Sequence, residues 1–215
     1  MTQLPFRDRA EAGRLLGAEL ASRNLPQDSI VLALPRGGVP VGFEVARALA
    51  APLDVVVVRK LGVPWQPELA MGAIASGGVR ILDERLILQE GIPSEEIESV
   101  AANEAQEVER RELLYRGDRS PLELRNRPVI LVDDGLATGS TMLAAVKCVQ
   151  SLQPSAVTVA VPVASRQACT LIRNEADDCV CLATPTPFIA VGEWYQDFRQ
   201  TSDVEVRELL RQAAC

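Results

Sequence analysis

Val129-Ile130-Leu131-Val132-Asp133-Asp134-Gly135-Leu136-Ala137-Thr138-Gly139-Ser140-Thr141 decides the fold. Its leading apolar residues, 129–132, predict a strand buried on both faces, as in a parallel sheet. Two carboxylates follow where the strand ends, and a loop of small residues leads into an apolar helical run at 142–146. In open α/β sheets, ligands bind at the carboxyl ends of strands, where helix N-termini point. The stretch therefore predicts a strand, a binding loop and a helix, in that order.

The chemistry of the loop suits a phosphate monoester. Gly139 lets the backbone approach an anion closely, and the hydroxyls within 138–141 can donate beside the free amides of the helix N-terminus. The helix dipole also favours negative charge there. Asp133 and Asp134 would repel a phosphate but suit vicinal hydroxyls or a divalent cation. A ribose 5-phosphate is a ligand that presents a phosphate on one side and hydroxyls on the other.

This order resembles the signature for 5-phosphoribosyl 1-diphosphate (PRPP) in type I phosphoribosyltransferases: an apolar strand, two acids and a Thr-Gly-x-Thr-like loop. The resemblance implies that Asp133 and Asp134 are catalytic, hold the 2- and 3-hydroxyls of PRPP, and bind Mg²⁺ indirectly, through PRPP or water. It implies that the 5-phosphate is bound by Ala137, Thr138, Gly139, Ser140 and Thr141. The alternative is an ordinary strand–turn–helix with capping residues, but capping does not need two acids and two hydroxyls together.

A second strand, glycine loop and helix precede this stretch. Residues 30–34 form a buried-strand pattern, 35–40 a Pro-Arg-Gly-Gly-Val-Pro turn, and 41–50 a helix of small and apolar residues. Such a unit places a second anion-binding loop on the same sheet edge. The resemblance implies that Arg36, Gly37 and Gly38 bind pyrophosphate. The alternative is a tight turn with an exposed arginine.

A third strand is predicted over 53–58, and it ends in Arg59 and Lys60. Two cations at the carboxyl end of a strand, near two phosphate loops, suit a diphosphate. The family often has a basic residue here, which implies a pyrophosphate-binding and catalytic role for Lys60 and a weaker pyrophosphate-binding role for Arg59. If both side chains merely end a strand in solvent, these roles fall away.

Residues 61–127 are predicted to form an insert. The stretch 61–68 is irregular, 69–74 is a strand, and 79–82 is its hairpin partner. Relatives carry a mobile cover with a β-hairpin here. A long helix follows from Ser94, its candidate N-cap, to Arg116, with its acidic residues on a solvated face. A polar linker, 117–127, leads back to the central stretch.

The remaining pattern alternates between strands and helices. An opening helix starts with a capping box at Asp8; helices are predicted over 142–152 and 165–174, and strands over 156–163 and 178–182. This predicts an α/β fold: a doubly wound, mostly parallel sheet flanked by helices, like that of type I phosphoribosyltransferases. We expect one domain, 1–215, with its core at 29–60 and 128–183.

The tail, 184–215, is predicted to form a hood and a closing helix from Thr201 to Ala214. It is rich in aromatic residues, which suit stacking on a planar base. The tail loosely resembles the hood of purine-type phosphoribosyltransferases, which makes Phe188 and Trp194 candidates for binding the acceptor. An aromatic cluster for core packing or for a dimer interface is an equally good interpretation.

Composition excludes several classes of function. A net charge of −7 argues against a binder of nucleic acid or of a membrane surface. The absence of histidine removes Ser-His-Asp and Cys-His catalysis and imidazole acid–base chemistry. The five cysteines form no C-x-x-C motif, which favours reduced thiols. Without an apolar signal core or a run of roughly 20 apolar residues, the chain is expected to be cytoplasmic.

The sequence favours an Mg²⁺-dependent transferase of nucleotide metabolism. It would move the phosphoribosyl group from PRPP to a nitrogenous acceptor, such as a salvaged nucleobase, and release pyrophosphate. A homodimer is expected from family habit, without a nucleic-acid or membrane partner. One alternative is a regulator that binds PRPP or a nucleotide without turnover; another is a structural partner of a different enzyme.

Overall fold

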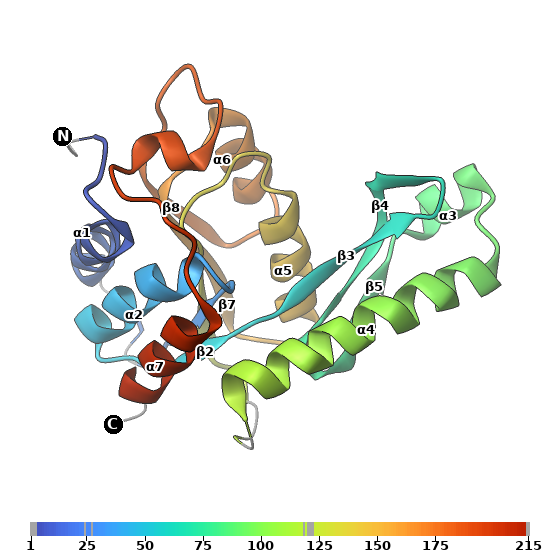
Figure 1. The fold of residues 1–215 in the computed structure, drawn as a ribbon, viewed down its shortest axis with the longest axis horizontal. Coiled ribbons are helices and arrows are strands. Elements are labelled where there is room, and N and C mark those ends of the chain that lie inside the picture. The colour runs from blue at the N-terminus through green and yellow to red at the C-terminus, as the bar shows by residue number, and fades with distance from the viewer. Residues whose placement is uncertain (1–3, 24, 27, 118, 120–122, 214–215) are drawn as a thin grey trace.

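The computed structural model describes residues 4–213 apart from 24, 27, 118 and 120–122. Its centre is a five-stranded parallel sheet in the order β2-β1-β6-β7-β8 (Figure 1). The strands are β1 (Ile30–Ala33), β2 (Leu53–Val55), β6 (Pro128–Val132), β7 (Ala156–Val163) and β8 (Asp178–Ala183). The register of β1 on β6 runs from Ile30↔Val129 to Ala33↔Val132, so these two strands end side by side.

Helices cover both faces of the sheet, and the side chains of β1 show how (Figure 1). Val31 and Ala33 belong to the core under α1, α2 and α7, whereas Ile30 and Leu32 belong to the core under α5 and α6. The helices are α1 (Arg9–Ala21), α2 (Gly38–Leu49), α5 (Ser140–Ser151), α6 (Arg166–Arg173) and α7 (Asp203–Ala213). The predicted doubly wound α/β fold is therefore confirmed.

The insert forms an arm that projects from the body (Figure 1). It contains a three-stranded antiparallel sheet in the order β3-β4-β5, a short 3-10 turn and two helices. Its elements are β3 (Val58–Val63), β4 (Gln66–Ala75), η1 (Ser76–Gly78), β5 (Val79–Leu82), α3 (Glu84–Glu90) and α4 (Ser94–Arg116). The predicted hairpin across 76–78 and the predicted helix over 94–116 are confirmed.

The single strand predicted over 53–58 is wrong. The chain leaves the core sheet after Val55, and Val57 donates its N–H to the Ser76 hydroxyl of the arm at 2.9 Å. Arg59 and Lys60 consequently lie within β3 of the arm rather than at the end of a core strand. A continuous valine run suits either sheet equally, so the break leaves no local signal. The irregular segment predicted at 61–68 is likewise wrong, because β3 and β4 meet across a tight turn there.

Helix starts differ from the sequence prediction by a few residues. The helix predicted from 41 begins at Gly38, with Gly37 as its N-cap. Ser94 is the first residue of α4, whose N-cap is Pro93, and α3 was not predicted. The Asp8 cap is confirmed, since its carboxylate accepts from the Glu11 N–H at 2.7 Å. Part of the linker predicted at 117–127, and the last residue of the closing helix, lie outside the described residues.

Two further properties concern the chain as a whole. Across the described part of the chain, every helix is too short or too polar to cross a bilayer. Cys148, Cys169, Cys179 and Cys181 are free thiols, and Cys215 falls outside the described residues.

A buried ion pair joins the arm to the body. Arg116, at the end of α4, lies with Nη2 3.0 Å from Asp54 Oδ2 of the edge strand β2. The two side chains are only 7% and 10% exposed. Because an unpaired buried charge is costly, each partner makes the other tolerable.

We expect Arg116→Met to lower the free energy of unfolding by about 3–5 kcal/mol, because it leaves the Asp54 carboxylate buried without its cation. Urea denaturation measures the loss. The control, Arg110→Met, removes an exposed pair on the same helix and should leave the midpoint unchanged. Adding Asp54→Leu to Arg116→Met should recover most of the loss. Equal midpoints for wild type and Arg116→Met would contradict the assignment.

Candidate functional site

Two loops meet at the carboxyl edge of the core sheet, directly after the paired ends of β1 and β6. The Leu34 N–H donates to the Val132 carbonyl at 2.9 Å, which continues the pairing past the end of β1. A Cβ added to Gly38 would lie 2.7 Å from the Val132 oxygen, and one added to Gly37 would overlap Asp134 Oδ2. The backbone of the Arg-Gly-Gly turn therefore lies against the acidic pair, in a place that only glycine fits.

The acidic pair is held in a network of short hydrogen bonds. Asp134 Oδ2 accepts from Arg9 Nε at 2.8 Å, and the Asp134 carbonyl accepts from the Tyr195 hydroxyl at 2.6 Å. The Asp134 N–H in turn donates to Asp133 Oδ1 at 2.8 Å. Both carboxylates are thus oriented before any ligand arrives.

Burial sets the electrostatics of the pair. It raises the pKa of Asp133 well above that of an ordinary carboxyl, and the nearby charge of Asp134 raises it further. Burial also raises the pKa of Asp134, while the Arg9 guanidinium opposes that rise. Two adjacent, partly desolvated carboxylates favour a proton, a cation or a hydroxyl donor nearby.

The loop at 137–141 is open toward solvent. Its side chains are exposed except at Gly139, which takes the left-handed backbone angle φ 81° at the N-cap of α5. The Ser165 hydroxyl at the start of α6 donates to the Ala137 carbonyl at 2.7 Å and fixes the loop from behind. The Thr138 and Ser140 hydroxyl oxygens are 3.2 Å apart. A helix N-terminus with clustered hydroxyls is suited to bind an anion.

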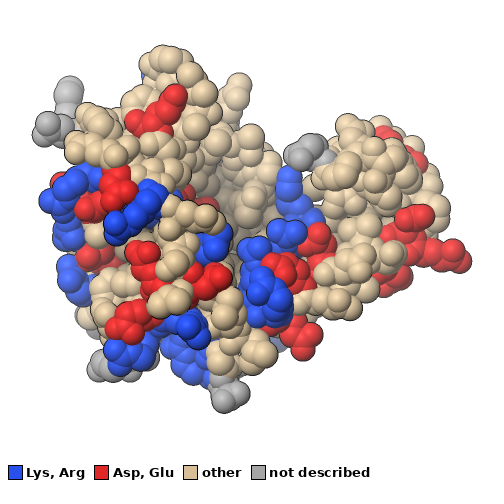
Figure 2. Space-filling view, in the orientation of Figure 1, with Lys and Arg blue, Asp and Glu red and all other residues tan. Residues whose placement is uncertain are grey.

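A cavity of about 680 Å³ connects the arm to this loop. It lies between the arm sheet and the outer face of α5, and Figure 2 shows the surface hollowed between body and arm. Lys60, Ser140 and Lys147 all line it, so the structure brings Lys60 to the phosphate-type loop. Arg59, the preceding residue of β3, faces the other way and pairs with Glu104 of α4 at 2.6 Å.

Arg36 points away from the acids, although its neighbouring glycines touch them. Its Nη1 lies 3.7 Å from Asp203 Oδ1 of α7, and the Tyr115 hydroxyl donates to the same oxygen at 2.7 Å. In this arrangement the turn offers its backbone to the site and its arginine to the margin.

The tail packs beside the acidic loop. A Cβ added to Gly135 would lie 2.6 Å from Val191 Cγ1 in η2 (Val191–Trp194), a 3-10 turn of the tail. The rings of Phe188 and Trp194 are 6.1 Å apart between centroids and belong to a cluster with buried Phe6. This agrees with the core-packing interpretation of the tail, and a role in binding an acceptor stays a prediction.

Sequence reasoning missed Arg9 and Tyr195. The sequence pattern places Arg9 in a packing helix, yet its side chain reaches Asp134 across 125 positions, and Tyr195 reaches Asp134 across 61. Neither residue has a local pattern that announces such a contact. The aromatic richness of the tail was the one available signal, and it pointed to an acceptor rather than to the acids.

The residues present suit a divalent cation shared with a ligand. Within the described ranges, acidic and cysteine side chains nowhere gather in a group of three that could hold a metal alone. Two carboxylates beside an open anion loop match the habit of Mg²⁺, which binds through one or two carboxylates together with substrate phosphates.

Comparison with known proteins gives consistent matches. Residues 11–197 match the phosphoribosyl transferase domain. Two Mycobacterium tuberculosis proteins, from strains CDC 1551 and H37Rv and provisionally named phosphoribosyl transferases, are each 45% identical over 208 residues, covering 97% of this chain. The chain spans 47% of their length. The crystal structure of TT1426 from Thermus thermophilus is 42% identical, with a TM-score of 0.89 over 97% of this chain and 99% of its own.

Asp133→Asn should stabilise the protein at neutral pH. A folded-state pKa above the unfolded value of about 3.9 means that stability from this carboxyl is present at low pH and is lost as pH rises through the folded-state pKa. Thermal midpoints should therefore favour Asp133→Asn at pH 7.5, and the gain should shrink toward pH 4. Asp28→Asn, at an exposed position, is the control. A lower midpoint for Asp133→Asn at pH 7.5 would refute this.

Gly37→Ala should destabilise the protein by about 1–3 kcal/mol, because the added methyl overlaps Asp134 Oδ2 and forces the turn from the acids. Urea denaturation measures this change. The control is Gly77→Asn, where an added side chain meets nothing within 4 Å and the φ of 76° is one that Asn tolerates. A Gly37→Ala variant as stable as wild type would show that the turn can yield.

Proposed function

Because this chain belongs to the phosphoribosyl transferase domain family, we propose that it transfers the 5-phosphoribosyl group of PRPP to a nitrogenous acceptor and releases pyrophosphate. The observation that carries the proposal is the contact of the Gly37–Gly38 backbone with Asp133 and Asp134, beside the open loop 137–141. One ligand that needs a diphosphate turn, two hydroxyl acceptors and a phosphate cradle within a few ångströms is PRPP.

Each part of PRPP has a counterpart in the site. The 5-phosphate binds at 137–141, through backbone amides, hydroxyls and the α5 dipole. The ribose hydroxyls donate to Asp133 and Asp134, whose raised pKa values reflect carboxylates short of hydrogen-bond donors and of water. The diphosphate lies against the backbone of Gly37 and Gly38.

The transfer needs charge stabilisation more than a nucleophilic side chain. The C1–O bond to pyrophosphate breaks, the C1–N bond to the acceptor forms, and the acceptor nitrogen loses a proton. Mg²⁺, held by PRPP and indirectly by the acidic pair, would neutralise charge on the leaving diphosphate. Lys60 adds a cation from the arm, and the carboxylates favour positive character on the ribose ring.

Asp133 suits the role of proton acceptor better than an exposed carboxylate would. A general base is most effective when its pKa lies near the working pH, and burial moves the pKa of Asp133 in that direction. Asp134 is already engaged by Arg9. A chain without histidine can thus still take up the acceptor proton.

A purine-like base in nucleotide salvage is the favoured acceptor, with Phe188 and Trp194 of the tail beside it and a homodimer as the expected assembly. The acceptor assignment relies on the adjacency of the tail to the acidic loop. Because the chain spans about half the length of the mycobacterial relatives, the activity of any longer protein is part of the same proposal.

A regulator that binds PRPP without turnover is the second candidate. Arg36 and Arg59 are both engaged by carboxylates, Asp203 and Glu104, rather than directed at the site. This leaves the diphosphate position with backbone amides and Lys60, an arrangement that supports binding more readily than departure of the leaving group.

The deciding experiment measures Mg²⁺-dependent pyrophosphate release from PRPP with purine, pyrimidine and other nitrogen acceptors, beside calorimetric binding of Mg·PRPP. Asp133→Asn combined with Asp134→Asn should weaken binding by about 1–3 kcal/mol for each lost contact and abolish release. Asp28→Asn should change neither quantity. Tight binding without release would establish the regulator, and the absence of binding would refute both candidates.

A further inference from the structure

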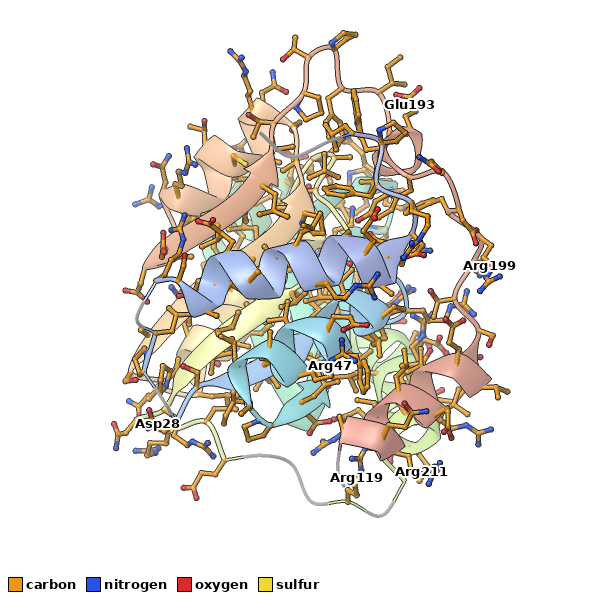
Figure 3. All side chains as sticks on the ribbon, turned by 90° about the vertical axis from the view of Figure 1, so that its left-hand side faces the viewer. Asp28, Arg47, Arg119, Glu193, Arg199 and Arg211 are labelled. Carbon is orange, nitrogen blue, oxygen red and sulfur yellow. The ribbon has the colours of Figure 1, made fainter. Side chains whose placement is uncertain are left out.

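Arg9 makes three contacts that fix its guanidinium at the acidic pair. Nε lies 2.8 Å from Asp134 Oδ2, Nη1 donates to the Arg199 carbonyl at 2.8 Å, and Cζ lies 3.9 Å from the Phe198 ring centroid. Figure 3 shows the segment that carries Arg199 passing the end of α1. An arginine fork uses such fixed geometry in a way that a lysine cannot.

The contact with Asp134 is sheltered from solvent. The side chains of Arg9 and Asp134 are 11% and 14% exposed, so water screens their interaction less than it screens a surface pair. Tyr195 binds the Asp134 carbonyl from the tail. Asp134 is therefore clamped by both the opening helix and the tail, whereas Asp133 is bonded only by the backbone N–H of Asp134.

We propose that Arg9 is a positioning residue that divides the acidic pair into two unequal carboxyls. Asp134 is the fixed anion, held by Arg9 in one orientation. Asp133 is the carboxyl left to exchange its proton and to meet a ligand's donors. The ligand part of this inference rests on the proposed function; the division of the pair does not.

The charges around the pair support this division. The titratable groups that face Asp134 are Arg9 from α1, Asp133 from its own loop and Tyr195 from the tail. Arg36, on the adjoining turn, pairs with Asp203 instead. Arg9 is accordingly the cation that offsets two neighbouring acids, and its removal leaves them to repel each other.

The test compares Arg9→Met and Arg9→Lys with Arg7→Met, whose side chain is 60% exposed and pairs with Asp8. The first measurement is the carboxyl titration of Asp133 and Asp134 by ¹³C NMR in unliganded protein. Arg9→Met should move both titrations to higher pH, Arg9→Lys should move them less, and Arg7→Met should leave them unchanged. If Arg9→Met does not fold, Arg9→Gln removes the same charge with a similar shape.

The second measurement is the pH dependence of Mg·PRPP affinity. Arg9→Met should weaken binding about 10- to 100-fold near pH 7 and shift the midpoint of the pH profile upward. A merely structural role would lower the melting temperature without moving the titration or that midpoint, and this outcome would overturn the inference. Shifted titrations in a protein that never binds Mg·PRPP would uphold the division of the pair while refuting the proposed function.

Discussion

Two adjacent carboxylates at the carboxyl edge of the sheet are the constraint on which the rest of the site depends. Partly desolvated acids side by side repel each other, so the fold must supply compensation from elsewhere. It does so with the Arg9 guanidinium and with a glycine turn that leaves no side chain in the way. The opening helix, the turn after β1 and the tail all converge on these acids.

The parallel register of the sheet makes that convergence possible. Because Ala33 pairs with Val132, the Arg-Gly-Gly turn and the acidic loop leave the sheet at the same height and in contact. A one-residue slip would exchange the two faces of β1 and separate the loops. The hydrophobic division between Val31 and Leu32 therefore fixes the site as well as the core.

Sequence reasoning succeeded where the determining interactions are local. The strand, acids, loop and helix of 129–141 carry their own hydrophobic and turn signals, and the structure follows them closely. It failed where partners are distant, as for Arg9 with Asp134, or where one pattern suits two sheets, as at 55–58. Long-range pairing depends on how the completed fold places its surfaces, which no short window of sequence contains.

Strand β3 joins two parts of the molecule through neighbouring residues. Arg59 is bonded to Glu104 of α4, while Lys60, one position along, lines the cavity that reaches Ser140. Adjacent side chains of a strand point to opposite faces, so the two are linked by a stiff, short piece of backbone. The strand thus acts as a lever: any tilt of the long helix relative to the body carries the ammonium group toward the anion loop or away from it.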